Sequence, residues 1–240
     1  MTAPMASRST GVSRREFLAT AAAVPLLLGS VATTAPGSLS TTRFVQHASR
    51  SGKHVCLTFH GSGSQSLTRQ VLALTERLKA PITVFAVGTW VEANPSLIQA
   101  IVAGGNEMAN HTLTHPALRR LGRADVAAEI IGCADTLRRV TGHKGAWFRP
   151  SGTPTPSTLI LEESAKAGYS TVVGYDVDPR DYQDPGSRLV VSRTLAGVQA
   201  GSIVSLHLGH QGTVDALTEI VAGVRQRGLE PVTVSRLLAP

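Results

Sequence analysis

Residues 82–109 read ITVFAVGTWVEANPSLIQAIVAGGNEMA and contain a complete strand–helix–strand pattern. The first six residues form an apolar run with the length of a buried strand, and a second, shorter strand is expected over the last four residues, 106–109. Between them, Asn94 and Pro95 suit the cap and the first position of a helix, which ends at Gly104-Gly105. The stretch therefore predicts a βαβ unit, in which the two strands run parallel.

The same alternation continues on both sides of this unit. Further strands are expected at 54–59, 146–149, 169–174, 202–206 and 231–234, and helices at 66–79, 124–140, 157–167, 188–198 and 213–227. The strands are apolar throughout, as in parallel strands that are buried on both faces. About 190 residues of this α/β pattern favour an incomplete parallel (β/α) barrel of about seven strands, because a complete eightfold barrel typically needs roughly 250. A doubly wound open sheet is the second interpretation.

The N-terminus is typical of an export signal rather than of folded structure. Arg14 and Arg15 precede an apolar run and then small residues, which indicates a twin-arginine signal over 1–35. The apolar run is shorter than the roughly 20 residues that span a bilayer. Residues 36–52 are rich in Ser, Thr and Gly and are interpreted as a linker, and 53–240 as the domain. We expect an extracellular or cell-wall location, with no stable membrane anchor after cleavage.

The composition narrows the classes of partner. Hydrophobic residues make up 42% and charged residues 16%, which is ordinary for a globular protein and not for a disordered one. The formal net charge of +7 favours anionic surfaces such as a cell wall. Lys/Arg runs with interleaved aromatics are missing, which argues against nucleic acid. Cys56 and Cys133 lack metal-ligand spacing and are expected to be buried thiols, although export would allow a disulfide.

Polar side chains gather just past the C-terminal ends of five predicted strands. The active sites of (β/α) barrels are built on that rim, so these side chains are expected to share one site. They are His60, His111, His115, Arg149, Asp176, Asp178, Asp181 and His207.

His111 and His115 are four residues apart, and on a helical turn this spacing places two rings on one face. Imidazole pairs suit zinc or a similar divalent cation, although a plain surface pair is the alternative. A catalytic zinc usually has three protein ligands and one open position, where it lowers the pKa of water for attack on a carbonyl.

Four short motifs then occur in a fixed order. They are HTLTH at 111–115, RPSG at 149–152, DPRDY at 178–182 and SLH at 205–207. With these motifs on an alternating α/β background, the chain resembles the polysaccharide deacetylase family over about residues 53–238, in the chitooligosaccharide deacetylase homology domain. The resemblance implies a metal-dependent hydrolase that removes N-acetyl groups from a polysaccharide or cell-wall glycan. Tyr182 stands where the family has a tryptophan.

The resemblance also implies roles for three residues. His207 would be the general acid that protonates the leaving amine, and Asp181 would pair with it and stabilise its protonated form. Arg149 would orient the catalytic base. The alternatives are a hydrogen-bonded histidine at the end of a strand for His207, a turn or capping residue for Asp181, and an ordinary salt bridge for Arg149.

The first motif departs from the family. Where the family has Thr-Phe-Asp-Asp-Gly, this chain has Thr-Phe-His60-Gly61. His60 takes the position of the base Asp, and Gly61 takes that of the metal-binding Asp. Three roles stay open for His60: base, polar filler, or third metal ligand beside His111 and His115. Three imidazoles and a water are a known zinc arrangement.

Three functions therefore compete. The first is a zinc-dependent carbohydrate deacetylase. The second is a catalytically silent carbohydrate-binding protein that keeps the barrel without the carboxylates of the first motif. The third is hydrolysis of another carbon–nitrogen bond in a small amide. A tightly bound equivalent of metal would favour an enzyme over the silent binder.

Overall fold

The computed structural model describes residues 42–239. The expected export signal and the first part of the expected linker lie outside the described residues. The strands are β1 (Arg43–Val45), β2 (His54–Gly61), β3 (Thr83–Ala86), β4 (Glu107–Asn110), β5 (Thr171–Val173), β6 (Ile203–His207) and β7 (Glu230–Pro231). The central sheet has the order β4-β3-β2-β6, with β7 against the start of β2, and every one of these pairs is parallel.

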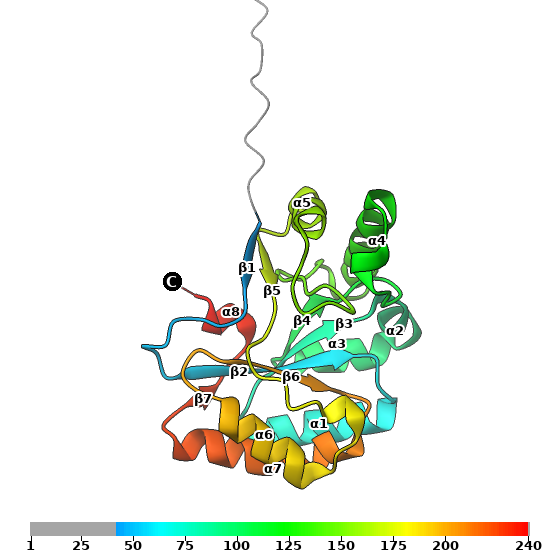
Figure 1. The fold of residues 1–240 in the computed structure, drawn as a ribbon. Coiled ribbons are helices and arrows are strands. Elements are labelled where there is room, and N and C mark those ends of the chain that lie inside the picture. The colour runs from blue at the N-terminus through cyan, green and yellow to red at the C-terminus, as the bar shows by residue number, and fades with distance from the viewer. Residues whose placement is uncertain (1–41, 240) are drawn as a thin grey trace, which may run out of the picture. The chain divides into compact units, whose positions relative to one another are not determined.

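Single-residue bridges continue this sheet toward closure. Phe148 pairs with Asn110 on one side and with Val172 in β5 on the other, and β1 pairs with β5. Val177, which follows β5, pairs with Val204 in β6. The predicted incomplete parallel barrel is confirmed, and Figure 1 shows β2, β3 and β6 side by side in its middle.

Helices alternate with the strands, as predicted. They are α1 (Gln65–Leu78), α2 (Gly88–Ala93), α3 (Pro95–Ala103), α4 (Arg123–Thr141), α5 (Thr158–Lys166), α6 (Ser187–Gly197), α7 (Gln211–Gln226) and α8 (Val234–Leu237). Two 3-10 turns, η1 (Leu118–Arg120) and η2 (Asp181–Gln183), complete the set. The expected helix at 94–103 is confirmed, with Asn94 at the cap position and Pro95 first. Gly142 ends α4 in the left-handed conformation at φ 83°.

Several short segments differ from the prediction. Residues 88–93 form α2, a helix that was not expected from the sequence. Residues 43–45 lie in the expected linker but form β1, because pairing with β5 orders a run too short to stand out among Ser and Thr. The expected strand at 146–149 is reduced to the bridge at Phe148. The expected strand at 231–234 divides between β7 and α8, because Thr233 caps a helix: its side chain accepts a hydrogen bond from the Arg236 amide.

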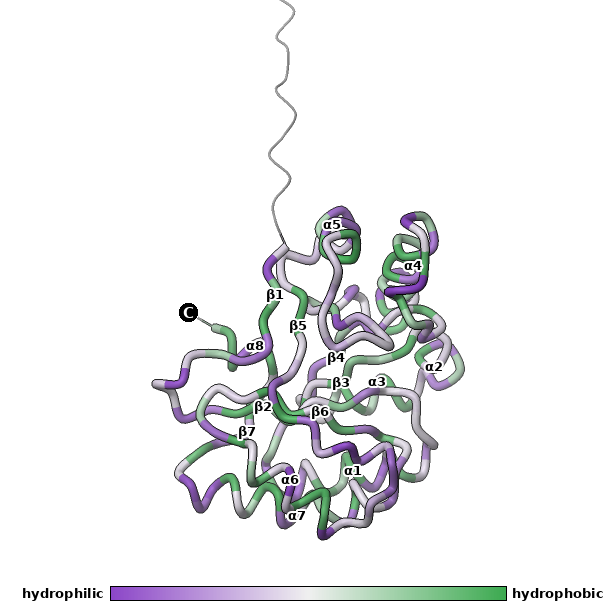
Figure 2. The backbone as a smooth tube through the Cα atoms, in the orientation of Figure 1, coloured by the Kyte–Doolittle hydropathy of each residue, from purple (hydrophilic) through white to green (hydrophobic). Residues whose placement is uncertain are grey.

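The core is aliphatic, as the scarcity of aromatic residues predicted. Leu57, Val84, Val204 and Ile220 are all fully buried. Figure 2 shows hydrophobic segments at β1, β5 and α7. Burial of this kind stabilises the fold by roughly 25 cal/mol for each Å² of apolar surface removed from water. Within the described range, no helix combines the length and the apolar character needed to cross a membrane.

Cys56 and Cys133 are both buried and free, as expected. Burial raises the pKa of the Cys133 thiol to about 12 and raises that of Cys56 as well. Both thiols are therefore protonated and unreactive at neutral pH, and they act as small core residues.

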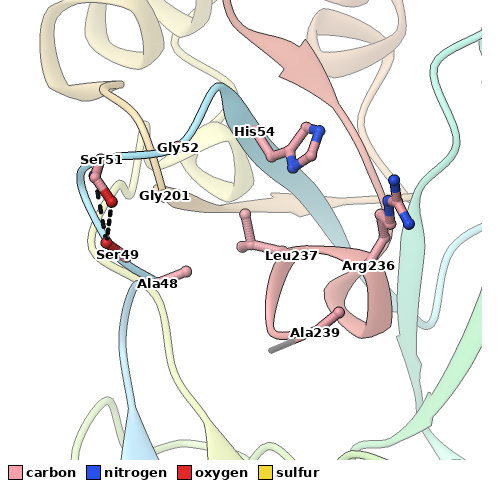
Figure 3. A pocket seen from close by; sticks show the side chains of 9 residues that line it. All are labelled: Ala48, Ser49, Ser51, Gly52, His54, Gly201, Arg236, Leu237 and Ala239. Atoms are coloured by element: carbon pink, nitrogen blue, oxygen red, sulfur yellow. Dashed lines mark hydrogen bonds between the residues drawn. The ribbon is translucent and has the colours of Figure 1, made fainter.

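A cavity of about 330 Å³ lies at the N-terminal end of β2, around His54. Its lining includes Arg236, Ser49 and Ser51, and the two serine hydroxyls hydrogen-bond each other at 2.8 Å (Figure 3). In (β/α) barrels this end of the strands serves stability, whereas catalytic residues lie at the other end. Catalytic residues are therefore expected at the opposite rim, where the strands end.

Candidate active site

The register of the central strands brings His60 and His207 together. His60 is the last residue but one of β2 and His207 is the last residue of β6, and the two are paired directly across these parallel strands. Their rings stack with centroids 4.4 Å apart. The sequence thus places two imidazoles side by side because each follows an apolar run that ends at the same edge of the sheet.

Gly63 lets the loops after these two strands meet. Leu208 donates its amide hydrogen to the His60 carbonyl at 3.2 Å. A Cβ on Gly63 would lie 2.4 Å from the backbone of Leu208, so any larger residue would push the loops apart. The close approach at Gly63 helps to keep the histidines adjacent.

His111 and His115 also meet, but not on a helical turn as expected. Residues 111–115 form an irregular loop in which Thr112 and His115 have φ values of 71° and 64°. This left-handed backbone is uncommon outside glycine. The two rings nevertheless lie with centroids 4.9 Å apart. The spacing predicted the pairing correctly, whereas the tertiary contacts of the loop, not helical periodicity, produce it.

The orientation of His111 is fixed by one hydrogen bond. Its Nδ1 donates to the carbonyl of Arg149 at 2.8 Å, which leaves the lone pair on Nε2. Nε2 is buried and has no hydrogen-bond partner among the residues that the structure describes. A buried polar atom without a partner is costly, so this nitrogen is suited to bind something that the protein itself does not supply.

His60, His111 and His115 each place a potential ligand atom within 4.8 Å of the others. His111 is 1% exposed, while His115 lies at the surface. Burial, with neighbouring positive groups, holds the pKa of His60 and of His111 well below the ordinary value, and burial also lowers the pKa of His115. All three are therefore neutral at neutral pH, which is the form that binds metals.

His60 also contacts residues outside this cluster. Its Nε2 accepts a hydrogen bond from Nη1 of Arg149 at 3.2 Å and lies 3.0 Å from the hydroxyl of Ser205. Arg149 thus keeps the place expected from the third motif, with an imidazole where a carboxylate was expected.

Arg149 is 2% exposed and makes no salt bridge within residues 42–239. Each of its nitrogens has an acceptor besides His60: Thr58 Oγ1 at 2.9 Å, the Val173 carbonyl at 3.1 Å and the Gly174 carbonyl at 2.9 Å. The guanidinium also lies over the ring of Phe85 at 3.9 Å. Burial lowers the pKa of Arg149 to about 9, so it stays charged at neutral pH.

Asp181 and His207 form the expected pair. His207 Nδ1 lies 2.7 Å from Oδ1 of Asp181, which is 1% exposed. The carboxylate also accepts hydrogen bonds from the amides of His207 and Tyr182, at 2.7 and 3.1 Å, and from Thr213 Oγ1 at 2.6 Å. These donors satisfy the buried carboxylate and hold it in one orientation. Because Nδ1 of His207 is engaged, Nε2 is the nitrogen left for a substrate.

A cavity of about 290 Å³ joins the pair to the cluster. Its lining includes all three histidines of the cluster and His207, together with Tyr175, Asp178, Tyr182 and Ser205. Tyr182 is 45% exposed, and its ring lies 5.2 Å from that of His207. The cavity has the size of a small ligand site, and its polar groups converge from several strands.

Position 61 is closed to a side chain. A Cβ on Gly61 would lie 2.9 Å from Val84 and 3.1 Å from the ring of Trp90. The Trp90 indole is fixed by a hydrogen bond of 2.8 Å to the Gly63 carbonyl. The carboxylate that the family places here is therefore not only missing but replaced by aromatic packing.

Of the other two predicted rim aspartates, Asp178 lines the cavity and Asp176 does not. Asp176 accepts hydrogen bonds from Arg50, Ser202 and the Ile203 amide, and so braces β6 instead of lining the cavity. Asp178 does line the cavity, while its Oδ1 accepts from the Arg180 amide in a local turn.

Sequence reasoning missed Ser205 and Thr213. Their hydroxyls contact His60 and Asp181, but serine and threonine carry no distinctive spacing that would single them out.

Comparison with known proteins identifies the family. The polysaccharide deacetylase family model matches residues 47–172. This chain belongs to the polysaccharide deacetylase family. A chitooligosaccharide deacetylase from Bradyrhizobium sp. (strain ANU 289) is 35% identical over 201 residues, which cover 74% of this chain and 87% of that protein.

Solved structures agree with this assignment. A family 4 carbohydrate esterase from Streptomyces lividans, in complex with acetate, has a TM-score of 0.68 at 29% identity, covering 75% of this chain and 91% of that one. A family 4 pseudoenzyme from Bacillus anthracis has a TM-score of 0.77 at 20% identity, covering 82% and 69%. At that identity the second likeness concerns the fold alone.

Proposed function

We propose that this polysaccharide deacetylase family member is a metal-dependent hydrolase that removes N-acetyl groups from carbohydrate. The observation that carries the proposal is the partnerless buried Nε2 of His111, at the centre of three neutral imidazoles and beside the Asp181–His207 pair. The related Bradyrhizobium protein is named for action on chitooligosaccharide, so an oligomer of N-acetylglucosamine is the first substrate class to test.

His60, His111 and His115 would hold the cation. Three neutral nitrogen ligands suit zinc, and the partnerless Nε2 of His111 fits such a role. A bound divalent cation would polarise the amide carbonyl and lower the pKa of the attacking water. His111 is oriented for this task by the Arg149 carbonyl, in the way that carbonyls commonly orient metal-binding histidines.

His60 can join the cluster only if its Nε2 is released from Arg149 or if the other ring nitrogen is used. Release is inexpensive, because Nη1 of Arg149 keeps its bond to Thr58 Oγ1 at 2.9 Å. The remaining guanidinium nitrogens bond backbone carbonyls and are unaffected. No charged group would therefore be left unsatisfied when His60 turns toward a cation.

His207 would carry out both proton transfers. As water attacks the amide carbonyl, Nε2 of His207 takes a proton from it, and Asp181 stabilises the resulting imidazolium. As the carbon–nitrogen bond breaks, the same proton passes to the leaving nitrogen, so that a free amine and acetic acid are formed with His207 restored, and the acid then loses its proton to solvent as acetate. One residue serves twice because the first motif supplies no carboxylate base.

The test is acetate release from chitooligosaccharide by the purified chain. We expect release with zinc present, loss after treatment with a chelator, and recovery when zinc is returned. A chain that holds one equivalent of zinc but releases no acetate from any N-acetylated glycan would refute the proposed reaction.

The second candidate is a catalytically silent carbohydrate-binding protein. Gly61 favours it, because the packing of Trp90 leaves no room for the family's ligand carboxylate. Glycan binding without bound metal and without acetate release would establish this alternative.

Export by the twin-arginine route is part of the proposal, supported by Arg14-Arg15 and the apolar run after them. Replacing both arginines with lysine should leave the precursor inside the cell, as fractionation and immunoblotting would show. Secretion of the Lys-Lys variant at the wild-type level would contradict a twin-arginine signal.

A further inference from the structure

The loop that carries His115 is held in an unusual conformation by its surroundings. Its left-handed residues, Thr112 and His115, are not glycines, so the conformation carries a cost that other contacts must offset. On the side of α2, the amides of Gly88 and Thr89 donate to the carbonyls of Thr112 and Leu113, both at 2.9 Å. These bonds fix the first half of the loop but not the residue next to His115.

Glu129 in α4 holds that residue. Its Oε2 accepts the amide hydrogen of Thr114 at 2.9 Å, and its Oε1 accepts the Thr114 hydroxyl at 2.6 Å. Both oxygens of the Glu129 carboxylate thus accept hydrogen bonds from Thr114, the residue immediately before His115. Hydrogen bonds to a charged acceptor are roughly twice as strong as neutral ones.

A second contact between α4 and the loop accompanies these hydrogen bonds. Leu113 packs so closely on Gly132 that a Cβ at position 132 would lie 2.8 Å from its side chain. Glu129 and Gly132 are one helical turn apart and face the same loop. Gly132 of α4 therefore contacts Leu113, and Glu129 binds Thr114. Together these two contacts fix the backbone position at which His115 begins.

Glu129 also supplies negative charge close to the three-histidine cluster, which contains no carboxylate. The carboxylate expected at position 61 is missing, and Arg149 adds a buried positive charge. A nearby anion reduces the repulsion that a divalent cation would meet there.

We propose that Glu129 is a positioning residue of the metal site, which orients His115 through its two bonds to Thr114 and offsets part of the charge of the bound cation. The proposal rests on the metal site of the proposed function. It assigns Glu129 no contact with substrate.

The test measures zinc affinity by competition with a chromogenic chelator. Glu129→Ala should weaken zinc binding about 10- to 100-fold, the effect typical of residues that orient metal ligands. Glu129→Gln, which keeps one acceptor but loses the charge, should fall between that variant and the wild type. Thr114→Val, which removes only the hydroxyl bond, should also weaken binding, by a smaller factor.

Glu92→Ala is the matched control. Glu92 also ties α4 to a neighbouring segment, through Arg139 at 3.2 Å, but does not touch the loop of residues 111–115. It should bind zinc like the wild type. If Glu129→Ala and Glu129→Gln bind zinc as tightly as wild type, or if Glu92→Ala weakens binding as much as they do, the proposal is overturned.

Failure of this proposal is distinguishable from failure of the proposed reaction. Wild-type zinc binding that depends on Glu129, without acetate release, would uphold the positioning role and refute the deacetylase. Acetate release by a protein whose zinc affinity does not depend on Glu129 would uphold the deacetylase and refute the positioning role. A wild-type chain that binds no zinc would overturn both.

Discussion

Replacing His60 with alanine is expected to cost the protein its bound metal together with its activity. The cluster would fall from three imidazoles to two, and Gly61 cannot supply a replacement third ligand because glycine has no side chain. Since catalytic zinc sites usually rest on three protein ligands, we expect metal content well below one equivalent and acetate release reduced about 100-fold or more. Elemental analysis of the purified variant measures its metal content, and an acetate assay measures its activity.

Ser205→Ala provides the control. The Ser205 hydroxyl lies 3.0 Å from the same His60 nitrogen that Arg149 contacts, but Ser205 is not in the metal cluster. This variant should keep its metal. If His60→Ala retains a full equivalent of zinc while losing activity, His60 acts as a base held by Arg149, in the position that the family gives to an aspartate. If it retains both zinc and activity, His60 is neither ligand nor base.

The fold was predictable where the chain repeats a simple rule. Apolar runs such as residues 82–87, with the helical patterns between them, predict most strands and helices of the barrel to within two residues of their observed bounds. The failures are segments whose structure depends on a partner. Residues 43–45 become a strand only because β5 lies beside them, and Phe148 remains a single bridge between β4 and β5.

The candidate site was predictable as a set of residues but not as a geometry. Parallel strands end at one rim, so His60, His207 and Asp181 were expected to meet, and His207 lies 2.7 Å from Asp181. The His111–His115 loop was not predictable, because its shape comes from α2 and from Glu129 in α4, which are distant in the sequence. Contacts between residues that are distant in the sequence leave no local sequence pattern from which they could be predicted.

The crowding at Gly61 is another consequence of distant packing. In the sequence Gly61 looks like a simple deletion of a carboxylate, which one substitution would restore. In the structure the Trp90 ring and Val84 occupy the space, and the indole is fixed by Gly63. The altered motif is therefore part of the core packing around β2, and in the proposed metal site His60 would take the place of the missing carboxylate ligand.

Replacing His207 with alanine should reduce turnover about 10²- to 10⁴-fold while leaving the metal in place. The loss follows from the proposed double role, because neither the attacking water nor the leaving amine would have a positioned proton carrier. His207 is outside the three-histidine cluster, so metal content and the substrate KM should change little. Measuring kcat, KM and zinc content on the same preparation separates these effects, and added imidazole should restore part of the lost turnover.

Asp181→Asn tests the partner of His207. The asparagine keeps the size of the side chain but removes the charge that stabilises the imidazolium and offers an amide N–H group where Nδ1 needs an acceptor, so kcat should fall at least 10-fold. Thr213→Val, which removes a 2.6 Å hydrogen bond but leaves the carboxylate, should cost less. Wild-type turnover in His207→Ala would refute the proton-transfer role. A fall in zinc content in Asp181→Asn, with kcat per bound zinc unchanged, would move Asp181 from the proton-transfer pair to the support of the metal site.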